Sequence, residues 1–210
     1  MRKNILFIPL LIFLAGTFAF AEQKEMSFDV SPFWGWEKWD SKFSTNEDMI
    51  GGLRFAWNIT KNIGLEAHYD LAESNMYPVN YSVGGDKYKE EIDYTLATYG
   101  VNFLWNFETE IEKWVPYVTV GVGMANVEGD WSLSINGTKS DALSDDDSGF
   151  MYDYGVGVKK FFNDWIAFRF DLRGLTYKVW DSADAVLYQW DGNTRNLQAS
   201  IGVTIQFGVK

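Results

Sequence analysis

Apolar side chains recur at every second position in eight separate segments of this chain. The clearest segment lies at the C-terminal end, where apolar residues from Leu197 to Phe207 alternate with polar residues or glycine. A period of two is the repeat of a β-strand, whose successive side chains point to opposite faces of a sheet. The other seven segments are 26–36, 51–58, 63–71, 98–107, 116–124, 150–161 and 166–174. We therefore expect eight strands, each with one apolar and one polar face.

The connections between these segments alternate between short and long. Short turns centre on Thr60 and Asn163, and residues 108–113 form a third short connection. The other four connections are much longer, roughly 37–48, 73–90, 128–148 and 178–195. An even number of strands, with short turns at one end and long loops at the other, predicts an all-β fold: an eight-stranded antiparallel up-and-down transmembrane β-barrel. Both termini would lie on the short-turn, periplasmic side, and segments 130–140 and 185–190 would extend strands above the membrane.

Alternation alone does not say which face points outward. A soluble barrel of the lipocalin type also has eight strands, but its apolar face is turned inward around a ligand. Here the polar face is rich in glycine, which a narrow barrel interior needs and a water-facing surface does not. These glycines are Gly52, Gly64, Gly100, Gly121, Gly123, Gly155, Gly157 and Gly202. Their placement favours the apolar-out, membrane-spanning arrangement.

The same polar face carries charges of both signs. The predicted interior polar network consists of Arg54, Glu66, His68, Asp70, Asp153, Lys159, Arg169, Asp171 and Arg173. With turns centred on Thr60 and Asn163, Arg54 would lie opposite Glu66, Gly52 opposite His68, and Asp153 opposite Arg173. Paired charges can satisfy one another inside a barrel, whereas an Arg or Lys on the lipid face at mid-membrane costs about 2–4 kcal/mol.

Aromatic residues gather near both ends of the predicted strands. Those next to the short turns are Trp57, Trp105, Trp114, Phe162 and Phe207, and those nearer the long loops are Trp36, Tyr69, Tyr94 and Tyr152. Two such bands are typical of the aromatic girdles at the two membrane interfaces. Pro32 conflicts with a closed barrel because it cannot donate a hydrogen bond within the first strand. A bulge at Pro32, or pairing that begins after it, would remove the conflict.

The first 21 residues have the features of a cleaved signal peptide. A basic start, Arg2 and Lys3, precedes a long apolar run that closes on the small-x-small sequence Ala19-Phe20-Ala21. The alternative is a permanent N-terminal membrane helix, since the run approaches the length that spans a bilayer. We expect a signal peptide at 1–21 and one barrel domain at 22–210. Removal of the signal would leave 16 basic against 29 acidic residues, a net charge of −13.

Composition excludes several classes of protein. The chain has no cysteine, so disulfides and the lipid anchor of a lipoprotein are both ruled out. The strong negative charge argues against nucleic acid as a partner.

The C-terminal residues Ser200, Gly202, Ile205 and Phe207 resemble the signal that the outer-membrane assembly machinery recognises in nascent barrels, although three further residues follow Phe207. Segments 116–123 and 155–173 resemble the small outer-membrane β-barrel family that groups OmpA/OmpX-like and opacity-type surface proteins. This resemblance implies a monomeric integral protein of a Gram-negative outer membrane. Its implied partners are outer-membrane lipids, lipopolysaccharide and, during biogenesis, the barrel-assembly machinery.

Little in the sequence predicts catalysis. The single histidine, His68, has Asp70 two residues away, but no serine is placed beside it as a nucleophile. We expect a hydrogen-bonded interior histidine, no enzymatic activity and no cofactor. Residues 144–149, with Asp145, Asp146 and Asp147, form the most acidic stretch; they lack the alternate spacing of a calcium loop. We expect a solvated loop tip there, bridged by divalent ions to lipopolysaccharide phosphates.

Three functions remain open at this point. The first is a non-enzymatic envelope or surface protein whose acidic extracellular loops carry any binding activity. The second is a narrow conduit similar to OmpW-type barrels, with an apolar pocket under loops that carry Trp131, Trp180, Tyr188 and Trp190. The third is a lipid-modifying barrel enzyme that would depend on His68.

Overall fold

The computed structural model describes residues 23–39, 48–75, 79–109, 113–139, 143–178 and 193–208. These residues form ten strands. The strands are β1 (Ser27–Lys38), β2 (Asp48–Asn58), β3 (Ile63–Asn75), β4 (Val79–Val83), β5 (Asp86–Asn106), β6 (Trp114–Ile135), β7 (Thr138–Lys139), β8 (Leu143–Phe161), β9 (Ile166–Lys178) and β10 (Asn193–Gly208). Within the described ranges, no helix is long and apolar enough to cross a membrane. The predicted signal peptide lies outside the described residues.

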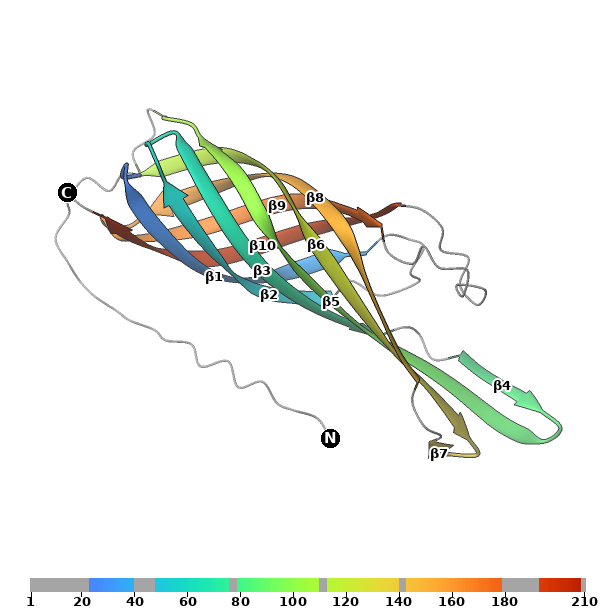
Figure 1. The fold of residues 1–210 in the computed structure, drawn as a ribbon. Helices are drawn as coiled ribbons and strands as arrows, with labels where there is room; N and C mark the ends of the chain where they lie inside the picture. Colours follow the sequence, from blue (N-terminus) through green and yellow to red (C-terminus); the bar gives the residue numbers. More distant parts are fainter. Residues whose placement is uncertain are drawn as a thin grey trace.

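Eight of the strands close into an antiparallel barrel (Figure 1). The order around the barrel is β1-β2-β3-β5-β6-β8-β9-β10, and β10 pairs back with β1. Followed from partner to partner, the register starts at Lys38 and returns to β1 at Phe28, ten residues earlier. Eight strands with this stagger tilt against the barrel axis and enclose a space just wide enough for side chains. The predicted eight-stranded barrel is confirmed.

The two faces of the strands have the predicted orientation. On β1 the residues alternate strictly between buried and more exposed, with Trp34 and Trp36 turned outward. Outward-facing apolar side chains such as Phe55 and Val120 are more than half exposed, whereas Arg54 and Glu66 are fully buried inside. An exterior of this kind suits lipid, because the apolar band of a membrane barrel faces outward.

Three strands run well beyond the others and form a projection from the barrel. β5 has 21 residues, β6 has 22 and β8 has 19. Figure 1 shows β4, the start of β5, the end of β6 and β7 reaching away from the barrel. Two tight turns with positive φ angles, at Gly84-Gly85 and Asn136-Gly137, connect β4 to β5 and β6 to β7.

The projection corrects two of the predicted loops. Most of 73–90 and much of 128–148 are strand rather than loop. Of the predicted extension 130–140, residues 130–135 belong to β6 and Thr138–Lys139 form β7, which pairs back with β6, as predicted. The predicted extension 185–190 lies outside the described residues.

The two short turns after β2 and β8 are centred one residue later than predicted. In the first, the Thr60 Oγ1 atom accepts hydrogen bonds from the N–H groups of Asn62 (3.2 Å) and Ile63 (2.9 Å). In the second, Asn163 Oδ1 accepts from the N–H groups two and three residues later, at 3.1 and 2.7 Å. A side chain that caps the following N–H groups belongs to the first half of a turn. Thr60 and Asn163 therefore lie before the centre.

This shift changes the predicted pairs of interior residues. Arg54 lies opposite His68 instead of Glu66, and Gly52 lies opposite Asp70 instead of His68. Across the second turn, Asp153 lies opposite Leu175 and Gly155 lies opposite Arg173. The three predicted direct pairings are wrong, although all of these charged side chains do point into the barrel.

Pro32 neither bulges β1 nor delays its pairing. Pro32 is paired with Leu53 of β2, and the register with β10 is the same before and after it. The β1–β10 ladder is interrupted only at Ser31 and Pro32, because Pro32 has no N–H to donate on that side. The hydroxyl groups of Ser31 and Thr204, 2.8 Å apart, hydrogen-bond across the gap.

Candidate functional site

The middle of the barrel interior is filled by a cluster of buried charges, which we call the arginine cluster: Arg54, Glu66, Arg169, Asp171 and Arg173. Asp171 accepts from Arg54 Nη1 at 2.5 Å and from Arg169 Nε at 2.9 Å. Glu66 accepts from Arg173 Nη2 at 2.5 Å and from both terminal nitrogens of Arg169. Bidentate pairs of this kind fix the geometry of both partners.

Further polar groups surround the arginine cluster. The Tyr117 hydroxyl donates to Asp171 and accepts from Arg169 Nε at 2.7 Å. Asp153 accepts from the Asn102 side chain and lies 3.9 Å from Arg173 Nη1. Three guanidinium groups thus face three carboxylates, so the charges balance within this part of the interior.

Lys159, although predicted as part of the same network, lies in a separate group near the short-turn end. Its Nζ atom donates to Asp29 Oδ2 at 2.6 Å and to Gln23 Oε1 at 3.0 Å. Gln206 Nε2 also donates to Asp29, at 3.2 Å. The sequence reasoning missed Asp29, although the alternation of the first strand places it on the same face as the other interior charges.

A second missed carboxylate lies toward the opposite end of the interior. Glu37 accepts hydrogen bonds from Asn196 Nδ2 at 2.6 Å and from Gln198 Nε2 at 3.1 Å. These contacts join β1 to β10 from the inside of the barrel.

His68 and Asp70 lie inside the barrel, both almost fully buried. His68 Nδ1 and Asp70 Oδ1 have no hydrogen-bond partner among the described residues. The predicted interior position of His68 agrees with the structure, but a hydrogen bond at Nδ1 is not present. A catalytic histidine must contact a nucleophile and reach substrate. In the described part of the chain, no hydroxyl group lies within hydrogen-bond distance of His68 Nδ1.

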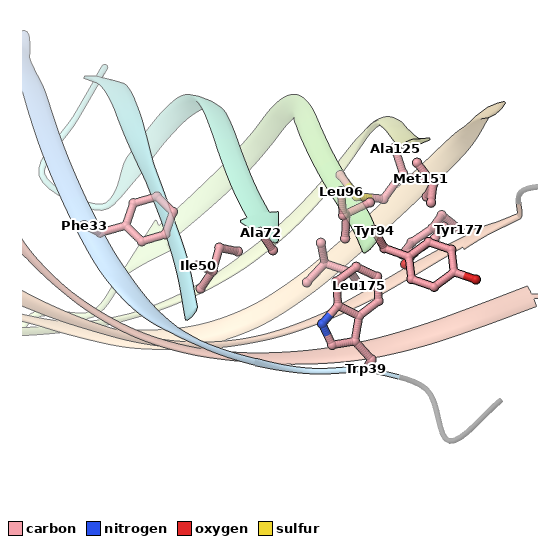
Figure 2. Close-up of a cluster of buried hydrophobic side chains, with 11 residues drawn as sticks. Phe33, Trp39, Ile50, Ala72, Tyr94, Leu96, Ala125, Met151, Leu175 and Tyr177 are labelled. Atoms are coloured by element: carbon pink, nitrogen blue, oxygen red, sulfur yellow. The ribbon is translucent and has the colours of Figure 1, made fainter. Parts of the chain in front are cut away.

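Above the arginine cluster, toward the long-loop end, the interior turns apolar. Figure 2 shows this apolar plug, a cluster of side chains that are at most 5% exposed. Its members are Phe33, Trp39, Ile50, Ala72, Tyr94, Leu96, Ala125, Val127, Met151, Leu175 and Tyr177. The Arg54 guanidinium lies 4.0 Å from the centre of the Phe33 ring and so joins the two layers. The plug occupies the level at which a conduit would need an apolar pocket.

Tyr94 corrects the predicted outer girdle. It is 4% exposed and belongs to the plug, because even-numbered residues of β5 face inward. The other predicted girdle residues have outward positions: Trp36, Trp57, Tyr69, Trp105, Tyr152, Phe162 and Phe207 are exposed, and Trp114 is half-buried with Lys160 Nζ 4.7 Å from its ring centre.

The residues of the predicted assembly signal lie on β10 with alternate orientations. Ser200 is buried, and its hydroxyl accepts from Arg54 Nη2 at 3.4 Å. Phe207 points outward opposite Phe28 of β1, and Ile205 is half-buried. Gly202 lies opposite Phe33 where β1 and β10 meet.

Residues 144–149 are not a loop tip. They belong to β8 and pair with β6, so that Asp146 lies opposite Glu128 and Asp147 opposite Val127. Among the described residues, no three histidine, cysteine, aspartate or glutamate side chains come together in a way that could hold a metal ion.

The tip of the projection carries a shallow groove. It is lined by Asn80, Tyr81, Ser82, Lys87, Tyr88, Lys89, Ser134 and Gly137. Tyr81 and Tyr88 stack with their rings 5.2 Å apart, and the Tyr81 hydroxyl donates to Glu90 at 2.6 Å. This hydrogen bond raises the pKa of Tyr81. Asn136 joins the two hairpins, since it donates to Asp86 at 2.7 Å and accepts from the Lys87 N–H at 2.9 Å.

A closed antiparallel barrel with an apolar exterior and a charge-paired interior defines a β-barrel membrane protein. The family described as "Outer membrane protein beta-barrel domain" matches residues 6–207. The chain therefore belongs to this family and is an integral protein of the outer membrane, as the sequence predicted.

Solved structures show the same fold at low sequence identity. Neisserial surface protein A is 16% identical, with 87% of this chain and 100% of that chain covered and a TM-score of 0.57. A major outer membrane protein from Thermus thermophilus is 11% identical, covering 86% and 99% of the two chains, with a TM-score of 0.52. OprG from Pseudomonas aeruginosa is 15% identical, covering 90% and 99%, with a TM-score of 0.50. No curated protein sequence matches significantly.

Proposed function

We propose that this protein is a non-enzymatic surface protein of the outer membrane, in which the barrel is an anchor and the projection carries the binding activity. The supporting observation is the contrast between the filled interior and the projecting strands. The arginine cluster and the apolar plug occupy successive levels of the barrel, with their side chains almost wholly buried. Rigid barrels place binding residues on the segments that extend from them.

The projection suits a role in contacts outside the cell. By the rule for outer-membrane barrels, short turns face the periplasm and the longer connections face outward. The groove at the tip combines stacked tyrosines with lysine, serine and asparagine side chains. Tyrosine and small polar residues are the types that predominate in adaptable binding surfaces.

Three measurements test the two halves of this proposal. Vesicles that carry the refolded chain should show no steady conductance and should release no fatty acid from phospholipid or lipid A. The full chain and a variant with the tip shortened at both hairpins are then compared on a glycan array. We expect binding that depends on the tip, with the barrel's heat-modifiable gel band unchanged. Equal binding by both proteins would contradict the proposal, as would lipid hydrolysis that the substitution His68→Ala abolishes.

A narrow conduit is the second candidate, favoured by the apolar character of the plug under the projecting strands. A conduit requires the side chains of the apolar plug to move apart so that a solute can pass. Liposome swelling in small nonelectrolytes distinguishes the two candidates. Swelling faster than that of protein-free vesicles would favour the conduit, and equal rates would favour the anchor.

A further inference from the structure

β4 forms one edge of the sheet in the projection. Among the described residues, β4 (Val79–Val83) pairs only with β5 and stands at one end of the strand order. Native proteins usually protect such an edge with a charged side chain, a proline or a bulge. The five residues of β4, Val-Asn-Tyr-Ser-Val, include none of these, and their pairing with β5 is uninterrupted. An edge of this kind is a template for a further strand.

The pairing of β4 with β5 decides which backbone groups of β4 point away from the sheet. A two-residue turn at 84–85 joins the strands, so Val83 and its partner on β5 are joined by hydrogen bonds. Hydrogen-bonded and non-hydrogen-bonded pairs alternate along an antiparallel ladder. Val83 and Tyr81 therefore turn their N–H and C=O groups toward β5, whereas Asn80 and Ser82 turn theirs outward.

These outward groups are complementary to a second copy of the same strand. If two β4 strands run antiparallel about Tyr81, Asn80 of each copy lies opposite Ser82 of the other. Both residues present an N–H and a C=O group, so the two pairs exchange four hydrogen bonds. A register centred on Asn80 would instead bring Ser82 opposite Pro78, which has no N–H to donate. A register centred on Ser82 would bring Asn80 opposite Gly84, outside the strand.

The side chains favour the same register. Tyr81 would meet Tyr81 of the second copy as a non-hydrogen-bonded pair, in which side chains approach most closely. Tyr81 is 39% exposed and stacks on Tyr88 with the rings 5.2 Å apart. The contact would therefore continue a row of tyrosine rings across both copies, and aromatic pairs across strands are stabilising. Charge does not oppose it, because residues 79–90 contain two acidic and two basic residues although the whole chain has a net charge of −11.

The antiparallel arrangement places the two copies in different membranes. β5 runs without a break from the projection into the barrel, and β4 lies along its outer part (Figure 1). Two copies in one membrane are related by an axis along the membrane normal, which would make their β4 strands parallel. Antiparallel strands need a two-fold axis in the plane of the membrane, so the two barrels lie at opposite ends of the pair.

The contact is small, which decides how it acts. A pair of five-residue strands is too short to bury the roughly 1,000 Å² of a stable interface. Many copies on two facing membranes act together, however, and linked weak contacts bind far more tightly than each contact alone. We therefore expect adhesion between surfaces that carry many copies, without stable dimers in detergent solution.

We propose that the edge of β4 pairs with β4 of a second copy in a facing membrane, so that this protein joins two outer-membrane surfaces. The inference rests on the proposed function in that both place binding on the projection. It differs in using the backbone edge of β4, and it needs no ligand in the groove. Binding of glycans by the groove and pairing of β4 are therefore measured separately.

The first test measures clustering of beads. The full mature chain is refolded into nanodiscs, in which both faces of the membrane are accessible, and the discs are attached to beads at high density. Ser82→Pro removes an outward N–H group while leaving the hydrogen bonds to β5, and an edge strand tolerates proline at such a position. Ser82→Ala is the matched control, since it keeps the N–H group. Gel mobility without boiling and limited proteolysis report whether the barrel and the projection are intact.

The second test reads the register by cross-linking. The chain has no cysteine, so a single substitution is sufficient. In the proposed pair, Tyr81→Cys brings two Cα atoms about 4.5 Å apart at the two-fold axis, within the range of a disulfide. Val83→Cys is the control: Val83 is exposed on the same strand, but its counterpart in the second copy is four residues further along, about 13 Å away. Copper phenanthroline serves as the oxidant.

We expect native beads to cluster, Ser82→Pro beads to cluster at least fivefold more slowly, and Ser82→Ala beads to stay within about twofold of native. Tyr81→Cys should give at least fivefold more disulfide-linked dimer than Val83→Cys. Should Ser82→Pro disturb the projection, the two cysteine variants still decide the question.

The proposal is overturned if native beads stay dispersed, if Ser82→Pro and native beads cluster equally, or if cross-linking is equal at positions 81 and 83. Clustering of native beads with protein-free beads would also overturn it, because it would indicate contact with lipid. Glycan binding that depends on the tip, without clustering, would refute this inference and leave the proposed function standing. Loss of both activities would refute both.

Discussion

Replacing Glu66 by glutamine removes one carboxylate from the arginine cluster while keeping the side chain's size. Glu66 is fully buried and accepts hydrogen bonds from Arg169 and Arg173. In the Glu66→Gln variant three guanidinium groups would face only Asp171 and Asp153. Leaving a buried charge uncompensated costs about 3–5 kcal/mol. Because the amide oxygen still accepts a hydrogen bond, we expect the free energy of unfolding to fall by about 3 kcal/mol, near the lower end of this range.

The measurement is urea unfolding of the barrel in phospholipid vesicles, followed by tryptophan fluorescence and by gel mobility without boiling. Glu73→Gln is the matched control, since Glu73 is on the same strand but exposed on the outside. The free energy of unfolding of the Glu73→Gln variant should differ from that of the native chain by no more than about 0.5 kcal/mol. The double variant Glu66→Gln/Arg169→Gln restores the balance of charge. It should be more stable than the sum of the two single effects by about 1–3 kcal/mol.

Two results would refute this reasoning. If Glu66→Gln unfolds within about 0.5 kcal/mol of the native chain, water inside the barrel solvates the guanidinium groups and the pairing contributes little. If the double variant shows simple additivity, Glu66 and Arg169 are not coupled, despite their bidentate contact.

Three further substitutions test other parts of the molecule. Gly123→Ala would place a Cβ atom 2.2 Å from the Tyr99 carbonyl oxygen and should cost about 1–3 kcal/mol in urea unfolding; Gly64→Ala, with its nearest atom 3.2 Å away, should cost less, and the reverse order would contradict the packing argument. Phe207→Ala should lower the amount of heat-modifiable protein in the outer membrane of cells while leaving refolding into vesicles nearly unchanged; an equal defect in both assays would point to stability instead of recognition by the assembly machinery. Asn136→Ala removes two side-chain hydrogen bonds that join the ends of the two hairpins in addition to the β5–β6 ladder, and a residue with φ of 51° favours asparagine over alanine. Limited proteolysis should then cut the projection faster with the barrel intact, and unchanged cleavage would show that other contacts hold the hairpins together.

Alternation was sufficient to predict the barrel and its orientation, but not the partners within it. Which face a residue takes depends only on its position along the strand, so Arg54, Glu66 and Arg169 could be assigned to the interior from the sequence. Which of them touch depends on register, and register depends on the turns. A single-residue error at Thr60 or Asn163 moves every pairing across that turn by two positions. The register across each turn is set by the hydrogen bonds that the side chain of Thr60 or Asn163 accepts from two backbone N–H groups.

The apolar plug was missed for a different reason. The sequence reasoning took the apolar residues of each strand as one face, which holds only while the interior is polar. Toward the long-loop end the interior becomes apolar, so residue type no longer identifies the face there. Tyr94 shows the consequence: it was assigned to the outer girdle as an aromatic near a strand end. It lies an odd number of positions from Tyr99, an outward residue on the same strand, and that spacing alone would have placed it inside.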